Sequence, residues 1–144
     1  YAHAYVRHFL AWDVFDTMQI VYGALTRQNE RLLSTVAGRG VGVIVRGVIK
    51  RYRRDYDELL ARARLQELCA AGESANDFLI RFALSHRAIS VLIVGSGDAE
   101  HVRANVRAAE KGPLPAAVYA EAKRRLTAIG LRPGAPTPPA AAGS

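Results

Sequence analysis

The feature that most constrains the fold is the alternation of short apolar runs with segments of helical pattern. Apolar runs over residues 15–22, 41–45 and 91–94 have the length of strands and are rich in β-branched residues. Apolar residues at helical spacing follow over residues 29–37, 55–71, 75–85 and 115–129 and in a segment that begins at Asp98. Continuously apolar strands that alternate with helices predict an α/β fold, with a parallel sheet covered by helices.

The last of these strands leads directly into a helix through a glycine-rich turn. Val91-Leu-Ile-Val94 is followed by Gly95-Ser-Gly97, and Asp98 is a suitable N-cap for the helix that carries His101 and Asn105. Glycine allows close approach of a ligand to the backbone, and the N–H groups at a helix start favour phosphate. His101 and Asn105 share one helix face, since they lie four residues apart. This turn is a candidate nucleotide phosphate site, although both side chains also suit an ordinary helix surface.

The chain is basic, with 20 Lys and Arg residues against 13 Asp and Glu residues and a formal net charge of +7. These positive charges are spread over the helices, and the one dense cluster is Lys50-Arg-Tyr-Arg-Arg54. No pattern of a nucleic-acid-binding motif surrounds this cluster. A basic loop at the mouth of a site for a charged cofactor explains it equally well. We therefore expect no nucleic-acid partner, and nucleic-acid binding stays a rival interpretation.

The rest of the composition is that of an ordinary globular domain. No apolar run approaches the roughly 18 residues that cross a membrane, and the first residues lack the pattern of a signal peptide. The single cysteine, Cys69, cannot form an internal disulfide and has the position of a small hydrophobic residue in a helix. His3, His8 and His86 lack metal-ligand spacing. We expect a cytoplasmic protein with no membrane partner and no metal.

The two ends of the chain differ in character. Residues 1–12 have the pattern of the end of a helix that runs into a loop at Asp13, and the chain starts at Tyr1 rather than at Met. We therefore expect truncation or processing. Residues 132–144 are mostly Pro, Ala and Gly, with too few large apolar side chains to pack. We expect one domain over residues 1–131 and a disordered tail over residues 132–144.

Four segments resemble the C-terminal part of bacterial aldo/keto reductases. They are Phe15-Asp-Thr-Met-Gln-Ile-Val-Tyr22, Gly40-Val-Gly-Val-Ile-Val-Arg-Gly47, Gly112-Pro-Leu-Pro115 and the unit from Arg81-Phe-Ala-Leu-Ser-His86 to Asn105, which contains Glu100-His-x-x-x-Asn105. The resemblance covers about residues 10–127. It implies a partial TIM (βα)8 barrel, made of parallel strands six to eight and their covering helices. Ligands of such barrels bind at the carboxyl ends of the strands.

The resemblance also implies a binding site for NADP(H) or NAD(H). Gln19 matches a glutamine that hydrogen-bonds the nicotinamide carboxamide, and Arg46 matches the residue that lies against the nicotinamide ring. Tyr22 is a further candidate contact for cofactor or substrate. The loop along the pyrophosphate is matched by Gly47, Ile49, Lys50 and Arg51, and the adenosine phosphate end is matched by Gly95, Ser96, Gly97, His101 and Asn105.

This chain departs from the family pattern at the adenosine end. Many members have arginine where Gly97 stands and glutamate where Ala104 stands, and these residues help to hold the 2'-phosphate and the adenine. In the pyrophosphate loop, Val48 and Ile49 replace the common Pro-Leu. The preference between NADP(H) and NAD(H) stays open at this point.

No catalytic residue is assigned within the chain. By resemblance, carbonyl reduction requires a tyrosine as general acid, with a lysine, an aspartate and a histidine around it. The family's Asp-x4-Tyr pattern does not occur here: the residues five positions after each aspartate are Met18, Val21, Leu60, Arg62, Phe82 and Arg103. The complete enzyme is expected to reduce aldehydes or ketones together with a missing N-terminal half of the barrel. The chain by itself is expected to be inactive.

Another class of function also fits the sequence. A partial barrel could serve as a non-catalytic module that binds a nucleotide or a partner chain through its open face. Three strands by themselves leave two open edges and one open face, which favours self-association. Binding without turnover by a monodisperse chain would favour this alternative. Competition between NADPH and DNA would separate the rival interpretation, nucleic-acid binding, from cofactor binding.

Overall fold

The computed structural model describes residues 2–49 and 54–134, and the side chains of residues 5–49 and 54–134. Three parallel strands form one sheet in the order β1-β2-β3: β1 (Thr17–Val21), β2 (Gly42–Arg46) and β3 (Val91–Ile93). The helices are α1 (Ala2–Trp12), α2 (Glu30–Ala37), α3 (Tyr56–Arg62), α4 (Ala75–Leu84), α5 (Ala99–Glu110) and α6 (Ala116–Ala128), with a 3-10 helix, η1 (Leu65–Leu68). The predicted α/β fold with a parallel sheet is confirmed.

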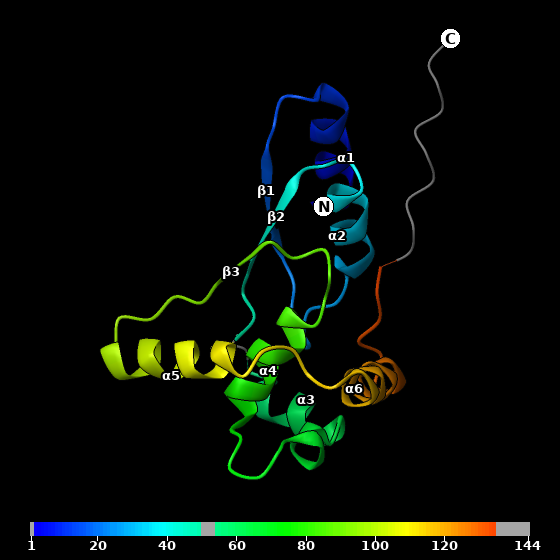
Figure 1. Cartoon of the computed structure of the whole chain (residues 1–144). Coiled ribbons are helices and arrows are strands. Elements are labelled where there is room, and N and C mark those ends of the chain that lie inside the picture. The colour runs from blue at the N-terminus through cyan, green and yellow to red at the C-terminus, as the bar shows by residue number, and fades with distance from the viewer. Residues whose placement is uncertain (1, 50–53, 135–144) are drawn as a thin grey trace.

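The helices lie on one side of the sheet and beyond its end. Figure 1 shows α1 and α2 beside the strands, and α3, α4, α5 and α6 gathered beyond the carboxyl ends of the strands. Helix α2 packs on β2, and α4 packs against α5. The opposite face of the sheet carries no helix among the described residues.

Burial therefore alternates along the strands. Met18, Ile20, Val43 and Val45 are buried under the helices, whereas their neighbours on the other face are open. The parallel register aligns Gln19, Ile44 and Val91 across this open face, and next to them Val21, Arg46 and Ile93. Continuously apolar strands predict a sheet covered by helices on both faces. The strands are half-buried because the sheet does not close into a barrel, so only one face is covered.

A continuous core joins the sheet to the helices. Large side chains with almost no exposure come from α2, α4 and α6, among them Leu33, Phe78, Phe82 and Leu126. A phenylalanine or leucine of this kind contributes about 1.5–3 kcal/mol when buried. Cys69 packs at the margin of this core, as expected for a small hydrophobic residue.

The predicted helix over residues 55–71 is wrong in its second half. Helix α3 ends at Arg62, Arg64 has a left-handed backbone with φ 50°, and Leu65–Leu68 forms the 3-10 helix η1. A left-handed residue other than glycine costs about 1–2 kcal/mol. This turn is held from outside, because Arg125 of α6 donates to the Arg64 carbonyl at 2.8 Å, and Leu65 is buried.

The loop after β1 is fastened to α6 by a buried ion pair. The Arg27 side chain donates to Glu30 at 2.6 Å and to the carbonyls of Lys123 and Leu131 at 3.0 and 3.1 Å. Lys123 pairs with the same Glu30 carboxylate at 2.7 Å. Beyond α6, the Gly134 N–H donates to the Gln28 carbonyl at 3.0 Å, so the described residues 132–134 lie against this loop. Residues 135–144 of the expected tail lie outside the described residues.

Candidate functional site

A pocket of about 360 Å³ lies at the carboxyl ends of β2 and β3, where the sheet meets α4 and α5. Four separate segments of the chain line it. They are Gly47, Val48 and Ile49 after β2; Ser74, Asn76 and Asp77 at the start of α4; Ile93, Val94, Gly95 and Ser96 at the end of β3; and His101, Ala104 and Asn105 of α5. The carboxyl ends of parallel strands are the usual ligand-binding edge of α/β folds.

The loop after β2 turns away from the sheet at Gly47. This glycine has φ 72°, a conformation that side-chain-bearing residues rarely adopt. The next residue, Val48, is buried in the core, which fixes the course of the loop past the pocket. A glycine at the strand end therefore allows the chain to place its backbone in the pocket wall.

The turn between β3 and α5 is organised by its own polar side chains. The Ser96 hydroxyl accepts from the Asp98 N–H at 3.1 Å, and the Asp98 carboxylate accepts from the Glu100 N–H at 2.7 Å. The predicted N-cap at Asp98 is thus confirmed. His101 Nδ1 lies 3.5 Å from the Ser96 hydroxyl, and its side chain is 67% exposed. Ser96 and His101 thereby present adjacent polar atoms to the pocket.

The opposite wall is formed by the start of α4, which sequence reasoning did not place at the site. Ser74 is the N-cap, and its hydroxyl donates to the Asp77 carboxylate at 2.8 Å. Asn76 Oδ1 accepts from the Tyr56 hydroxyl at 2.9 Å. The side-chain NH₂ group of Asn76 can therefore act as a donor to a ligand. The capping pattern of Ser74 and Asp77 was visible in the sequence, but nothing in it indicated that this helix start faces the turn after β3.

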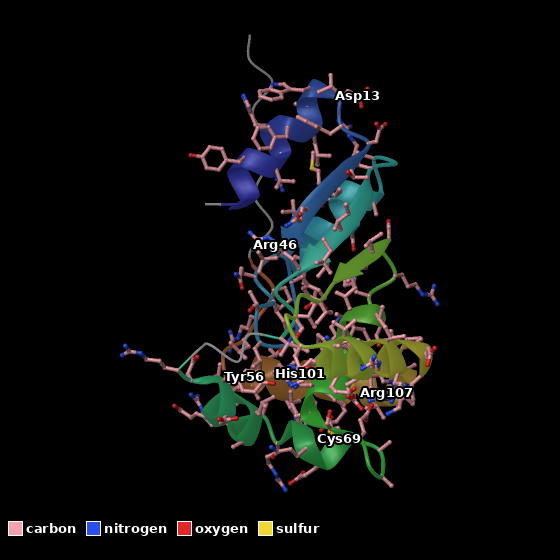
Figure 2. The ribbon with its side chains drawn as sticks, turned by 90° about the vertical axis from the view of Figure 1, so that its left-hand side faces the viewer. Asp13, Arg46, Tyr56, Cys69, His101 and Arg107 are labelled. Carbon is pink, nitrogen blue, oxygen red and sulfur yellow. The ribbon has the colours of Figure 1, made fainter. Side chains whose placement is uncertain are left out.

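Six of the twelve residues proposed from the sequence meet in this pocket: Gly47, Ile49, Gly95, Ser96, His101 and Asn105. Gly97 lies next to the lining, with no heavy atom within 4 Å of where its Cβ would be. Gln19 and Arg46 lie on the open face of the sheet, two residues apart in the register. Figure 2 shows Arg46 at the end of β2 and His101 on α5, beyond that end of the sheet. Lys50 and Arg51 lie outside the described residues.

Tyr22 is not at the pocket but in the core. Its side chain is fully buried between Phe82 and His86, and its hydroxyl lies 3.3 Å from that of Tyr119. Burial raises the pKa of Tyr22 far above its usual value, and the neighbouring Tyr119 adds to the rise. The structure thus leaves this phenol no surface for a ligand.

The chemical groups available at the pocket are those of hydrogen bonding rather than of metal binding. No group of three or more His, Cys, Asp or Glu side chains among them could hold a metal ion. Within residues 2–49 and 54–134 no helix is long and apolar enough to span a membrane. The pocket offers two hydroxyls, an imidazole, two amides, one carboxylate and backbone groups next to glycine. This set suits hydrogen bonding to a sugar, a phosphate or a heterocycle.

The family model and the solved structures that match this chain point to the same family. The model of the Aldo/keto reductase family matches residues 6–126. Among solved structures, the chain is similar to the aldo-keto reductase AKR11C1 from Bacillus halodurans in its holo and apo forms, each with a TM-score of 0.71 and 22% sequence identity. These matches cover 84% of this chain and 46% and 47% of the holo and apo chains. No curated protein sequence matches.

The likeness to the solved enzyme shows the fold of a partial barrel, since the chain spans about half of that enzyme's length (46%) and its sheet does not close. The family match covers most of this chain, from residue 6 to residue 126. The chain therefore belongs to the aldo/keto reductase family.

Proposed function

We propose that this chain supplies the cofactor-binding part of an NAD(P)H-dependent aldo/keto reductase that reduces aldehydes or ketones. One observation carries the proposal: four segments distant in sequence converge on one pocket at the carboxyl ends of β2 and β3, and six residues expected to bind the dinucleotide are among those that line it. The single cysteine of the chain suits a protein of the cytoplasm.

The adenosine phosphate end of the dinucleotide would occupy this pocket. The Ser96 hydroxyl would bond an oxygen of the adenosine 5'-phosphate, and the backbone at Gly95 and Gly97 would approach it closely because neither glycine has a side chain. His101 and Asn105 would bond the adenosine from one face of α5. Lys50 and Arg51, outside the described residues, would neutralise the pyrophosphate.

The nicotinamide end would lie on the open face of the sheet. Gln19 carries both a donor and an acceptor, which suits the carboxamide, and Arg46 offers a flat cationic surface to the ring. Both side chains are exposed on the uncovered face, and Arg46 directly precedes the loop that lines the pocket. The bound dinucleotide would supply the hydride, while these residues fix which face of the ring is presented.

The rest of the barrel would cover this open face. The chain spans 46% of the solved relative, and Val91 and Ile93 of β3 are exposed on the uncovered face. Apolar strand residues in this position suit the interior of a closed barrel. The catalytic tyrosine, lysine, aspartate and histidine would come from that other part, since this chain lacks the Asp-x4-Tyr pattern and Tyr22 is buried.

The test is a calorimetric titration of the purified chain with NADPH and with NADH, paired with an assay for reduction of a generic aldehyde. We expect binding of one dinucleotide per chain and no turnover, by a chain that self-associates through its open edges and open face. The same binding by a monodisperse chain would favour the non-catalytic module. Replacing His101 and Asn105 together by alanine should weaken binding by about tenfold, at about 0.5–1.5 kcal/mol for each hydrogen bond. Arg107→Ala, an exposed change on the same helix outside the pocket, is the control.

Each outcome of this experiment bears on a separate part of the proposal. Absence of any dinucleotide binding would remove the cofactor site. Equal weakening by the double variant and by Arg107→Ala would place the site elsewhere. Turnover by the chain alone, free of contaminating reductase, would contradict its expected inactivity.

A further inference from the structure

The charge of the pocket wall bears on which dinucleotide it accepts. Of the thirteen described residues that line the pocket, none is lysine or arginine, and the one carboxylate is that of Asp77. The 2'-phosphate that distinguishes NADP(H) from NAD(H) carries nearly two negative charges at neutral pH. Such a group needs a cation close by, whereas free ribose hydroxyls need only hydrogen-bond acceptors.

Asp77 stays ionised in this position. Burial alone would raise the pKa of its carboxyl, but hydrogen bonds from Ser74 and Lys111 outweigh burial and hold the pKa below its usual value. The Lys111 ammonium lies 3.2 Å from one carboxylate oxygen and is therefore already paired. A carboxylate has about four acceptor positions, so Asp77 can still accept a hydrogen bond from a ribose hydroxyl.

The positive ends of the two helices that border the pocket are also occupied. At the start of α5, Asp98 accepts from the Glu100 N–H at 2.7 Å and places its own negative charge there. At the start of α4, Ser74 accepts from the Asp77 N–H at 3.1 Å, and the Asp77 carboxylate lies within the first turn. Each helix thus has a carboxylate near its N-terminus, which offsets the attraction for a further dianion.

We propose that this pocket selects a dinucleotide without a 2'-phosphate, so that the chain binds NAD(H) in preference to NADP(H). The observations that carry this are the Asp77 carboxylate in the wall and the absence of a described cation from the lining. The inference rests on the proposed function, because it assigns the adenosine end to this pocket.

The test uses probes that reach only the adenosine end, because the nicotinamide end lies on the uncompleted face. ADP-ribose and its 2'-phosphorylated form are titrated into the purified chain by calorimetry. We expect ADP-ribose to bind at least tenfold more tightly. Equal binding, or tighter binding of the 2'-phosphorylated form, would overturn this inference and leave the proposed function standing. Binding of neither probe would overturn both.

Two variants test the physical cause. Asp77→Asn removes the charge but keeps the shape and the acceptor for Ser74, and should reduce the preference for ADP-ribose severalfold. Gly97→Arg adds a cation beside the pocket, where a side chain has space, and should shift the ratio of the two affinities about tenfold toward the 2'-phosphorylated probe. Gly97→Gln adds an uncharged side chain of similar reach and is the matched control; it should not shift the ratio of the two affinities toward the 2'-phosphorylated probe. An unchanged ratio in both Asp77→Asn and Gly97→Arg would contradict the electrostatic cause.

Discussion

The ion pair between Arg27 and Glu30 is expected to hold the loop after β1 in place, and replacing Glu30 by glutamine tests it. The Arg27 and Glu30 side chains are only 2% and 7% exposed, and the Glu30 carboxylate accepts from Arg27 at 2.6 Å and from Lys123 at 2.7 Å. Glu30→Gln keeps the volume but removes the charge. The Arg27 guanidinium would then stay buried with only neutral acceptors.

The magnitude follows from this burial. Removing one partner of a buried ion pair costs about 3–5 kcal/mol. Glutamine keeps one acceptor, so we expect a loss at the lower end, about 3 kcal/mol in the free energy of unfolding. For a chain of this size, that corresponds to a fall in Tm of roughly 10 °C. The assay is urea and thermal unfolding of the purified chain, followed by far-ultraviolet circular dichroism.

Glu58→Gln is the matched control for this prediction. Glu58 pairs with Arg62 at 3.4 Å one turn along α3, but the side chains of Arg62 and Glu58 are 52% and 66% exposed. An exposed pair of this kind contributes about 0.3–0.5 kcal/mol. If both variants lost less than about 0.5 kcal/mol, the reasoning that burial makes the Arg27–Glu30 pair important would be refuted.

Two further predictions follow from single contacts. Burial would raise the pKa of Glu30, but the hydrogen bonds from Arg27 and Lys123 lower it below its ordinary value of 4.5. The ionised carboxylate therefore stabilises the fold above pH 4.5, and this stabilisation is lost as the pH falls through the lowered pKa. The free energies of unfolding of the wild-type chain and of Glu30→Gln should thus converge in acid. A constant difference between them from pH 7 to pH 3 would contradict this. Gly23→Ala should lower the free energy of unfolding by about 1–3 kcal/mol, because the new Cβ would lie 3.1 Å from the Val48 Cα. Gly97→Ala is the control, since a Cβ there has open space. Equal urea midpoints for the two variants would refute the steric argument.

The sequence predicted those parts of the fold that depend on local pattern. The three strands, most of the helices that follow them and the cap at Asp98 depend on residues close together in the chain. The structure has them with shifts of one or two residues, except that α3 ends at Arg62. The turn after β3 was predictable for the same reason. Glycine, serine and an i, i+4 pair in α5 are local signals for a phosphate site.

The features that the sequence did not predict depend on distant contacts. The break after α3 is held by Arg125, which lies 61 residues from Arg64 in the chain. The burial of Tyr22 depends on Tyr119, which is 97 residues away. The start of α4 joins the pocket only because α4 and α5 pack together. Local pattern carries no information on such pairings, so these residues could not be assigned to the core or the site beforehand.

The central claim is that the pocket at the ends of β2 and β3 holds the adenosine end of a nicotinamide dinucleotide. The most direct measurement is a titration of the ¹⁵N-labelled chain with NADH, followed by the amide signals in nuclear magnetic resonance spectra. We predict that shifts concentrate on residues 46–49, 74–77, 95–97 and 101–105, with smaller shifts near Gln19, and that α1 and α6 are unaffected. Shifts confined to other segments, or none at saturating NADH, would contradict the account.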